Sequence, residues 1–268
     1  MVTVGAAQSN HARLTAILGR VVGLEVHLVL GGGRPAEPAG NLLLDRLAGA
    51  TVHAVDSEDW DVLADALSRT TKELEAAGGR PYAVPIGGST SVGAVGYARA
   101  YLELLDQLDR AGVRADWVVH ASSTGGTQAG LLAGRALAGR GPRVFGVDVA
   151  KGGPELRGTA LALANETLAR CGAGPSVTPE DVFTTDFTGP AYGELTPEAR
   201  QAIETALGTE GLVLDPVYSA KAVAALPVLA EAGSLPGDGA VVFLHTGGQP
   251  ALFATEYALD LTTGGLLR

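Results

Sequence analysis

Short apolar runs alternate with longer amphipathic stretches along most of the chain. The runs are rich in valine and short, which favours strands buried on both faces, and they cover residues 2–4, 26–30, 51–54, 82–85, 117–120, 144–147 and 241–245. The amphipathic stretches predict helices over residues 41–47, 61–77, 92–111 and 197–206. Such alternation is typical of βαβ units, so we predict an α/β protein with mostly parallel sheets.

Glycine and proline divide this pattern. The Gly- and Pro-rich segments 31–40 and 152–158 predict loops. Near residues 111–115 a long predicted helix ends, and a fresh strand leads into the loop richest in Ser, Thr and Gly. We therefore predict a smaller α/β domain over residues 1–111 and a larger α/β domain over residues 112–268.

Composition and charge narrow the class of protein. The 268 residues carry a formal net charge of −10, which argues against nucleic acid and anionic membranes as partners. A single cysteine, Cys171, excludes a disulfide framework. The first residues lack a signal-peptide pattern, and the most apolar stretch, 21–30, is too short to span a bilayer. We expect a soluble, cytoplasmic protein.

The segment HASSTGGTQAGLLAG, residues 120–134, is the strongest single motif. A strand ends, hydroxyl and glycine residues follow at 122–127, and a helix begins. Backbone N–H groups, hydroxyls and a helix N-terminus together form an anion site, for which phosphate is the usual ligand. The spacing fits neither a Walker A loop nor the dinucleotide G-x-G-x-x-G pattern. A tight turn with Ser/Thr caps is the structural alternative.

Two other junctions join a predicted strand to a predicted helix. In VGAAQSNHARLTA, residues 4–16, the polar turn lies where α/β enzymes place their chemistry. In PIGGSTSVGAVGY, residues 85–97, a glycine turn with a Ser/Thr cap is the simpler interpretation.

Two tyrosines and a threonine are further candidates. Tyr218 follows an Asp-Pro turn in DPVYSAKA, and Tyr192 lies between turns in GPAYGELTPEA. Such a tyrosine transfers a proton or only anchors a surface, and each taken singly favours the anchor. Thr246 ends a buried strand in VVFLHTGGQPALF, where its hydroxyl faces a crevice or satisfies the next turn.

The histidines give little support to a metal site or a hydrolase. The five histidines are scattered, and neither an HExxH motif nor paired cysteines occur. A Ser-His-Asp hydrolase would need a G-x-S-x-G elbow, which is also absent. We therefore expect no metal.

Seven stretches of the chain, taken in their order along the sequence, resemble the D-cysteine desulfhydrase and 1-aminocyclopropane-1-carboxylate deaminase family. These are pyridoxal-phosphate enzymes of the tryptophan-synthase-β type, with the fold-type-II architecture of two open three-layer α/β domains. The matching stretches are QSNHAR (8–13), NLLLDRLAGA (41–50), PYAVPIGGSTSVGAVGY (81–97), SSTGGTQAGLLAG (122–134), TGPAYGELTPEA (188–199), EGLVLDPVYSAKA (210–222) and HTGGQPALF (245–253).

The resemblance implies a cofactor, pyridoxal 5'-phosphate, and the residues that bind it. Asn10 would hydrogen-bond the ring oxygen of the cofactor, and Thr246 would meet its pyridine nitrogen. The phosphate would be held by Ser123, Thr124, Gly125, Gly126 and Thr127.

The resemblance also implies substrate-side roles. Ser9, Asn10 and His11 would receive the substrate carboxylate, and Ser9 would also serve proton transfer. Tyr192 and Tyr218 would line the substrate side as catalytic residues.

One position separates the subgroups of this family. Deaminase-like members resemble one another in having Glu after the tyrosine of DPVY, where it pairs with a protonated pyridinium. Here that residue is Ser219, and Thr246 supplies a neutral hydroxyl. An unprotonated ring is a weaker electron sink, which suits β-elimination of a good leaving group better than opening of a cyclopropane.

The family pattern also needs a lysine that forms the Schiff base with the cofactor. In relatives it lies upstream of QSN, in a segment resembling G-N-K-x-R-K, for which the residues before Gln8 leave no room. Lys72 is expected to be solvated, Lys151 to lie in a surface loop, and Lys221 to follow Tyr218 by one helical turn without a covalent role. We expect a truncated chain or a start site set too late, rather than a genuine but inactive chain. We also expect poor solubility or stability, because the absence of the N-terminal arm would expose an edge of the larger domain.

The sequence thus predicts a pyridoxal-phosphate-dependent carbon–sulfur lyase that performs α,β-elimination on cysteine-like amino acids, giving pyruvate, ammonia and sulfide. The alternatives are 1-aminocyclopropane-1-carboxylate deaminase or cysteate sulfo-lyase activity, or a catalytically silent homologue that only binds the cofactor. The expected partners are a small amino-acid substrate and, by the resemblance, a second copy in a homodimer.

Overall fold

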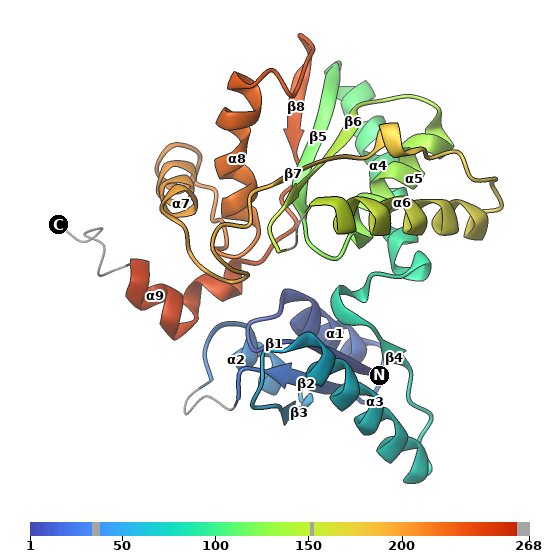
Figure 1. Cartoon of the computed structure of the whole chain (residues 1–268), viewed down its shortest axis with the longest axis vertical. Coiled ribbons are helices and arrows are strands. Elements are labelled where there is room, and N and C mark those ends of the chain that lie inside the picture. The colour runs from blue at the N-terminus through green and yellow to red at the C-terminus, as the bar shows by residue number, and fades with distance from the viewer. Residues whose placement is uncertain (34–37, 151–152, 262–268) are drawn as a thin grey trace. The chain divides into compact units, whose positions relative to one another are not determined.

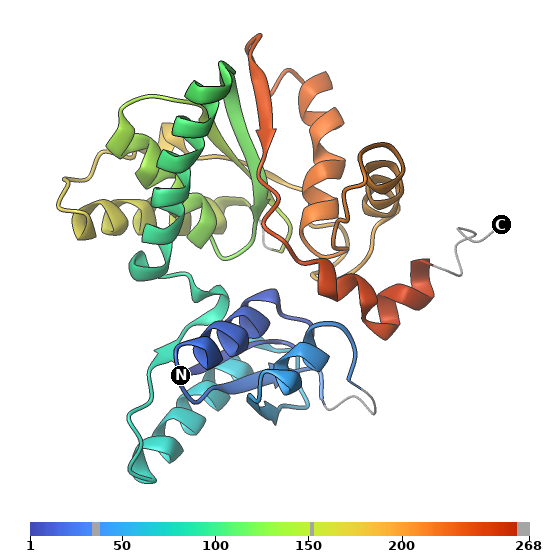
Figure 2. The same ribbon diagram turned by 180° about the vertical axis from the view of Figure 1, so that it is seen from behind.

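The computed structural model describes residues 1–33, 38–150 and 153–261. Over these residues the chain forms two compact units (Figures 1 and 2). Unit 1 runs from Met1 to Gly88 and takes in the described residues from Gln249 onward, whereas unit 2 is Ser89–Gly248. Each unit is built on a parallel sheet, as the sequence predicted.

Unit 1 has the described strand order β3-β2-β1-β4. Its strands are β1 (Val2–Ala6), β2 (His27–Gly31), β3 (Thr51–Ala54) and β4 (Ala83–Val84). Its helices are α1 (Asn10–Val21), α2 (Gly40–Leu47), α3 (Trp60–Ala76) and α9 (Thr255–Leu261), with short 3₁₀ turns η1 (Ile86–Gly88) and η3 (Gln249–Phe253).

The core of unit 1 follows from the two-residue period of its strands. Leu28 and Leu30 of β2 pack on one face of the sheet with Ala12 and Ala16 of α1. Val29, between them in sequence, points to the other face and packs with α3. The sheet is therefore covered on both faces, which explains why its central strands are mostly apolar.

Unit 2 repeats this arrangement in the described order β7-β6-β5-β8. Its strands are β5 (Ala115–Ser122), β6 (Arg143–Asp148), β7 (Phe183–Asp186) and β8 (Ala240–Phe243). Its helices are α4 (Ser91–Ala111), α5 (Gly126–Ala138), α6 (Gly153–Arg170), α7 (Pro197–Glu210) and α8 (Ser219–Glu231), with a 3₁₀ turn η2 (Pro179–Asp181).

Alternation along β5 divides the core of unit 2 in the same way. Val118 packs with residues of α4, α5 and α6. Its neighbours Trp117 and Val119 point to the opposite face, where α8 lies (Figure 1). Unit 2 is therefore also a three-layer α/β structure.

The division between the units differs from the predicted boundary near residue 111. Helix α4 belongs to unit 2, because two glycines of α5 allow the two helices to approach closely. A Cβ atom at Gly130 would lie 2.3 Å from the carbonyl oxygen of Ala94, and one at Gly134 would lie 2.7 Å from that of Ala98. At the other end of the chain, buried Ala251 and Ala254 lie in unit 1, and a Cβ at Gly40 would meet Ala254 at 3.2 Å.

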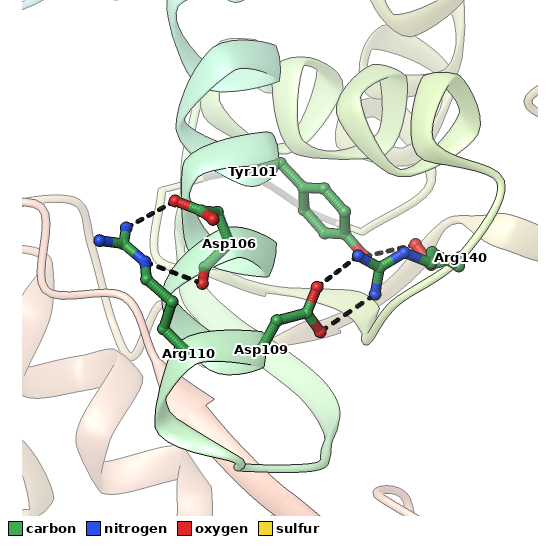
Figure 3. A network of polar contacts seen from close by, with 5 residues as sticks. All are labelled: Tyr101, Asp106, Asp109, Arg110 and Arg140. Carbon is green, nitrogen blue, oxygen red and sulfur yellow. Dashed lines mark hydrogen bonds and ion pairs between the residues drawn. The ribbon is translucent and has the colours of Figure 1, made fainter.

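Polar contacts join the C-terminal half of α4 to the residues that follow α5 (Figure 3). The fully buried Tyr101 donates its hydroxyl to the carbonyl of Pro142 at 2.7 Å, and desolvation raises the pKa of this phenol. At the surface, Arg140 forms an ion pair with Asp109 at 2.6 Å. The turn after α5 is thereby held against α4.

The predicted strands are all present, with ends shifted by one or two residues, and the four predicted helices also form. The loop predicted over 152–158 is wrong from residue 153, where α6 begins, because Pro154 lies in the first helical turn, where proline is favoured. Strand β7 was not predicted, because its sequence, FTTD, contains no apolar run; the strand lies at the edge of its sheet. No helix in the described part of the chain is both long and apolar enough to cross a bilayer.

A buried carboxylate on α2 stands out in unit 1. Asp45 is fully buried, and neither of its oxygens has a hydrogen-bond partner among the described residues. Desolvation raises the pKa of Asp45 to about 7, and the positive charge of Arg13 only partly opposes this shift. The group loses its proton near pH 4 in the unfolded chain but near pH 7 in the folded one, so it reduces stability progressively as the pH rises through this window.

We expect Asp45→Asn to remove this pH-dependent loss. The free energy of unfolding at pH 8 should rise by roughly 2–4 kcal/mol relative to the wild type, with little change near pH 4. Urea unfolding at pH 4.5, 6 and 8 measures the effect, with Asp65→Asn on the exposed face of α3 as the matched control. Parallel pH profiles for wild type and Asp45→Asn would contradict this interpretation.

Candidate active site

Two turns rich in polar residues follow β1 and β5, which hold equivalent places in the two sheets. In unit 1 the chain moves from β1 to β2 on one side, and β4 lies on the other side; β5, β6 and β8 repeat this order in unit 2. Ligands of open α/β sheets bind beyond the carboxyl ends of strands at such a switch point. The turn containing Ser9 follows β1, and the loop from Ser123 follows β5.

The loop after β5 has the geometry of an anion site. Ser123 and Thr124 lead to Gly125, which has φ +81° in the left-handed region and is the N-cap of α5. No side chain caps α5 within the part of the chain that is described. The N–H groups of its first turn, from Gly126 and Thr127 onward, are therefore available to an anion.

A second segment shapes this loop. The Ser89 hydroxyl lies 2.6 Å from that of Thr124, and a Cβ atom at Gly126 would lie 2.6 Å from the same Ser89 oxygen. Glycine at 126 is thus required for the close approach of the two segments. The sequence signal for Ser89 was the PIGGST motif, which we interpreted only as a turn with a cap; that cap exists, because Thr90 accepts a hydrogen bond from the N–H of Gly93 at 3.1 Å.

Buried polar groups hold the base of the loop. The Ser122 hydroxyl donates to Gln128 Oε1 at 3.1 Å, and Gln128 Nε2 donates to the carbonyl of Phe183 at 2.8 Å. Gly146 of β6 makes room for this side chain, since a Cβ there would lie 2.3 Å from Gln128 Oε1. A rigid loop of this kind, with free amides, hydroxyls and no carboxylate, fits the phosphate of pyridoxal phosphate.

Thr246 lies at the same edge of the sheet. It follows β8, which pairs in parallel with β5, and the ladder continues with a hydrogen bond from the N–H of Leu244 to the carbonyl of Val119. Thr246 is exposed. Its place beyond the carboxyl end of β8 suits contact with a ligand, and its role toward the pyridine nitrogen stays a prediction.

The structure brings Tyr192 and Tyr218 together. Their hydroxyl oxygens are 2.6 Å apart, and their rings meet edge to face with centroids 6.0 Å apart. Desolvation raises the pKa of the Tyr192 phenol, although the hydrogen bond with Tyr218 works in the opposite direction. The two phenols, from segments 26 residues apart, therefore form a hydrogen-bonded pair, and their role in proton transfer stays a prediction.

A buried carboxylate fixes the position of Tyr218. Asp215 caps α8 by accepting from the N–H groups of Val217, Tyr218 and Ser219 at 3.0, 2.9 and 2.8 Å. The hydroxyl of Ser219 also donates to Asp215 at 2.6 Å, and both side chains are buried. Ser219 is therefore occupied within the helix cap.

Lys221 performs the corresponding task for Tyr192. This fully buried side chain donates from Nζ to the carbonyls of Thr188 and Ala191 at 2.5 and 3.3 Å, which holds the segment before Tyr192 against α8. Desolvation lowers the pKa of Lys221. Of the other lysines, Lys72 is exposed on α3, as predicted, and Lys151 lies outside the described residues.

In unit 1 the turn after β1 begins helix α1. Ser9 is its N-cap and accepts from the N–H of Ala12 at 3.1 Å, so the N–H groups at Asn10 and His11 lie in the first turn, where a carboxylate is favoured. The His11 ring contacts the Thr3 hydroxyl at 2.7 Å, and desolvation lowers the pKa of His11 to about 4. The neutral ring offers a carboxylate no positive charge.

Asn10 is held by Asn41, a residue without a predicted role. Asn41 of α2 donates to Asn10 Oδ1 at 2.9 Å and to the carbonyl of Gln8 at 2.7 Å. The only signal for Asn41 was its place in NLLLDRLAGA, one of the stretches that carry the family resemblance.

Comparison with known proteins agrees with this geometry. The profile of a family described as "Pyridoxal-phosphate dependent enzyme" matches residues 1–247. The 1-aminocyclopropane-1-carboxylate deaminase of Methylobacterium sp. is 34% identical over 266 residues, which cover 96% of this chain and 79% of that protein. That of Bradyrhizobium diazoefficiens is 33% identical over 266 residues, with the same shares.

Solved structures give the same assignment. The crystal structure of an ACC deaminase homologue superposes with a TM-score of 0.88 at 34% identity, covering 98% of this chain and 77% of that one. Maize serine racemase, at 16% identity and a TM-score of 0.67 over 99% of this chain and 77% of that one, shares the fold. By its sequence, its two parallel three-layer units and these likenesses, the chain belongs to the fold-type-II family of pyridoxal-phosphate-dependent enzymes.

Proposed function

We propose that this protein is a carbon–sulfur lyase of the D-cysteine desulfhydrase type. It would convert a cysteine-like amino acid and water into pyruvate, ammonia and sulfide. In this reaction the α proton leaves, the β carbon–sulfur bond breaks, and water then replaces the nitrogen.

The arrangement around Ser219 carries this proposal. In the deaminase-like members that the chain resembles, a glutamate at this position pairs with a protonated pyridinium. Here Ser219 is buried, and its hydroxyl donates to Asp215 at 2.6 Å. No acid reaches the cofactor from position 219, and Thr246 offers a neutral hydroxyl instead. A neutral pyridine suits loss of a good leaving group, such as a thiol.

The residues of the chain would divide the remaining tasks between them. When bound, pyridoxal phosphate supplies an electron sink for the α carbon of the substrate. Residues 123–127 would hold its phosphate, and Asn10 would donate to its ring oxygen. The first turn of α1 would receive the substrate carboxylate, with Ser9 and the phenols of Tyr192 and Tyr218 available for proton transfer.

The names of the relatives favour a second candidate, deamination of 1-aminocyclopropane-1-carboxylate. Ring opening with addition of water would give 2-oxobutanoate and ammonia. Cysteate, with sulfite as leaving group, is a variant of the first candidate. The homodimer and the cytoplasmic location stay predictions.

The experiment that separates these functions is a product screen. Purified protein, with and without an N-terminal extension that supplies the Schiff-base lysine, is incubated with pyridoxal phosphate and D- and L-cysteine, L-cysteate, β-chloroalanine or 1-aminocyclopropane-1-carboxylate, and sulfide, sulfite and 2-oxo acids are measured. We expect sulfide and pyruvate from a cysteine. Product from the cyclopropane substrate alone would establish the second candidate, and uptake of cofactor without any product would indicate a binding protein.

The phosphate loop generates a prediction for cofactor affinity. Gly126→Ala would force a methyl group against Ser89 and widen the loop, so we expect the Kd for pyridoxal phosphate to rise by about tenfold or more. Fluorescence titration measures this. Gly158→Ala on α6, where a Cβ would meet nothing within 4 Å, is the matched control. Equal affinity of Gly126→Ala and wild type would exclude this loop as the phosphate site.

Lys221 generates a prediction for the tyrosine pair. Lys221→Met removes the two hydrogen bonds that hold the segment before Tyr192, so hydrogen exchange over residues 187–193 should increase. In the active enzyme kcat should fall by about one to two orders of magnitude, because the phenol is misplaced, while cofactor affinity is kept. Lys72→Met is the control. Unchanged exchange in Lys221→Met would contradict a positioning role.

A further inference from the structure

Asn41 is a buried polar residue of unit 1 whose side chain is hydrogen-bonded at both terminal atoms. It is fully buried at the start of α2 and makes four hydrogen bonds with described residues. Its backbone N–H donates to Gln8 Oε1 at 2.8 Å, and its side chain contacts Gln8, Asn10 and Arg13. Every one of these partners lies in the turn after β1 or the first turn of α1.

The partners of Asn41 fix which way its amide points. Arg13 Nε lies 2.9 Å from one terminal atom and can only donate, so that atom is the oxygen Oδ1. The carbonyl of Gln8 lies 2.7 Å from the other atom and can only accept, so that atom is the nitrogen Nδ2. The assignment of oxygen and nitrogen, which is often ambiguous in amides, is therefore determined by two groups that have no alternative role.

The same logic then orients Asn10. The Asn41 nitrogen lies 2.9 Å from the terminal atom of Asn10, which must accept and is therefore its oxygen Oδ1. The NH₂ group of Asn10 is left as the part of the amide that can serve a ligand. If the Asn10 amide were rotated by 180°, two NH₂ groups would face each other in a partly buried position, at a cost comparable to a lost hydrogen bond.

We propose that Asn41 is a positioning residue that holds Asn10 with its NH₂ group, and not its carbonyl oxygen, toward the ring oxygen of the cofactor. This inference rests on the proposed function, in which Asn10 donates to that oxygen. A donor stabilises the deprotonated ring oxygen, whereas a carbonyl oxygen in the same place would repel it.

Neighbouring groups make the arrangement rigid. Gln8 Nε2 donates to the carbonyl of Ala39 at 3.2 Å, and Gly40 leaves room for the Gln8 side chain, since a Cβ there would lie 2.5 Å from Gln8 Oε1. The charged groups nearby are Arg13, which binds Asn41, and Asp45 one turn further along α2. The turn after β1 is thereby locked to the start of α2.

The test uses two substitutions that remove the Asn41 donor. Asn41→Asp keeps an oxygen for Arg13, and Asn41→Leu keeps the approximate shape without polarity. The matched controls are Asn165→Asp and Asn165→Leu, because Asn165 of α6 also makes four hydrogen bonds, to Leu161, Ser176 and Val177, within unit 2. Thermal unfolding of all four proteins identifies effects that are only structural.

The readouts are the Kd for pyridoxal phosphate and the pH at which the visible band of the bound cofactor changes, which reports protonation of its ring oxygen. For both Asn41 variants we expect about a tenfold rise in Kd and an upward shift of that pH by about one unit. In an Asn10→Ala background, neither Asn41 substitution should weaken binding further, because Asn41 acts through Asn10. The Asn165 variants should bind and titrate like the wild type.

The possible results separate failure of the proposed function from failure of the role of Asn41. A wild-type protein that takes up no cofactor overturns the proposed function, and this inference with it. If the wild type binds and the folded Asn41 variants bind and titrate identically, only the role of Asn41 is wrong. Additive losses in the Asn10→Ala background would likewise overturn it, since they would show that Asn41 acts independently of Asn10.

Discussion

The parallel pairing of β1 and β5 with a neighbour on each side decides where a ligand site of this protein can lie. Strand β1 lies between β2 and β4, and β5 lies between β6 and β8, so the strand order reverses at β1 and at β5. The helices that follow β1 and β5 therefore begin at the switch point of each sheet, where ligands of open α/β sheets bind. At both places the backbone supplies uncompensated N–H groups at the start of a helix, which favour an anion. The site proposed for the substrate carboxylate thus lies in one unit, and the site proposed for the cofactor phosphate lies in the other. These are the two anionic groups that an amino acid and its cofactor present.

The side chains that a ligand would meet are held by buried polar residues further back. Asp215 holds Tyr218, Lys221 holds the segment before Tyr192, Gln128 braces the loop after β5, and Asn41 holds Asn10. Each of these four residues is almost fully buried. Burial of a polar group is costly unless its hydrogen bonds are made, so these contacts have few alternatives and specify one geometry.

The sequence predicted the strands and most helices because their signals are local. Valine-rich runs and amphipathic periods report burial residue by residue, and the ordered motifs reported the family. The missed elements had signals that were weak or misleading: Pro154 and its glycines suggested a loop where a helix begins, and the polar edge strand β7 lacked an apolar run. The division between the units was misplaced because it depends on Gly130 and Gly134 meeting α4, a contact between segments more than thirty residues apart.

The candidate site divides in the same way. Ser9, Asn10 and residues 123–127 could be selected from sequence because turns after strands have a recognisable composition. Asn41, Ser89 and Lys221 could not, since a single polar residue in an apolar helix or a glycine turn has no distinctive pattern, and its partner is set by folding. Asp45 belongs with them: a carboxylate inside LLLDRL lowers the stability of the fold at neutral pH, and hydrophobic burial alone does not account for it. Its charge lies near Arg13, which in turn binds Asn41, so the polar groups beneath the turn after β1 form one connected set. A fold selected only for stability would have filled these positions with apolar side chains.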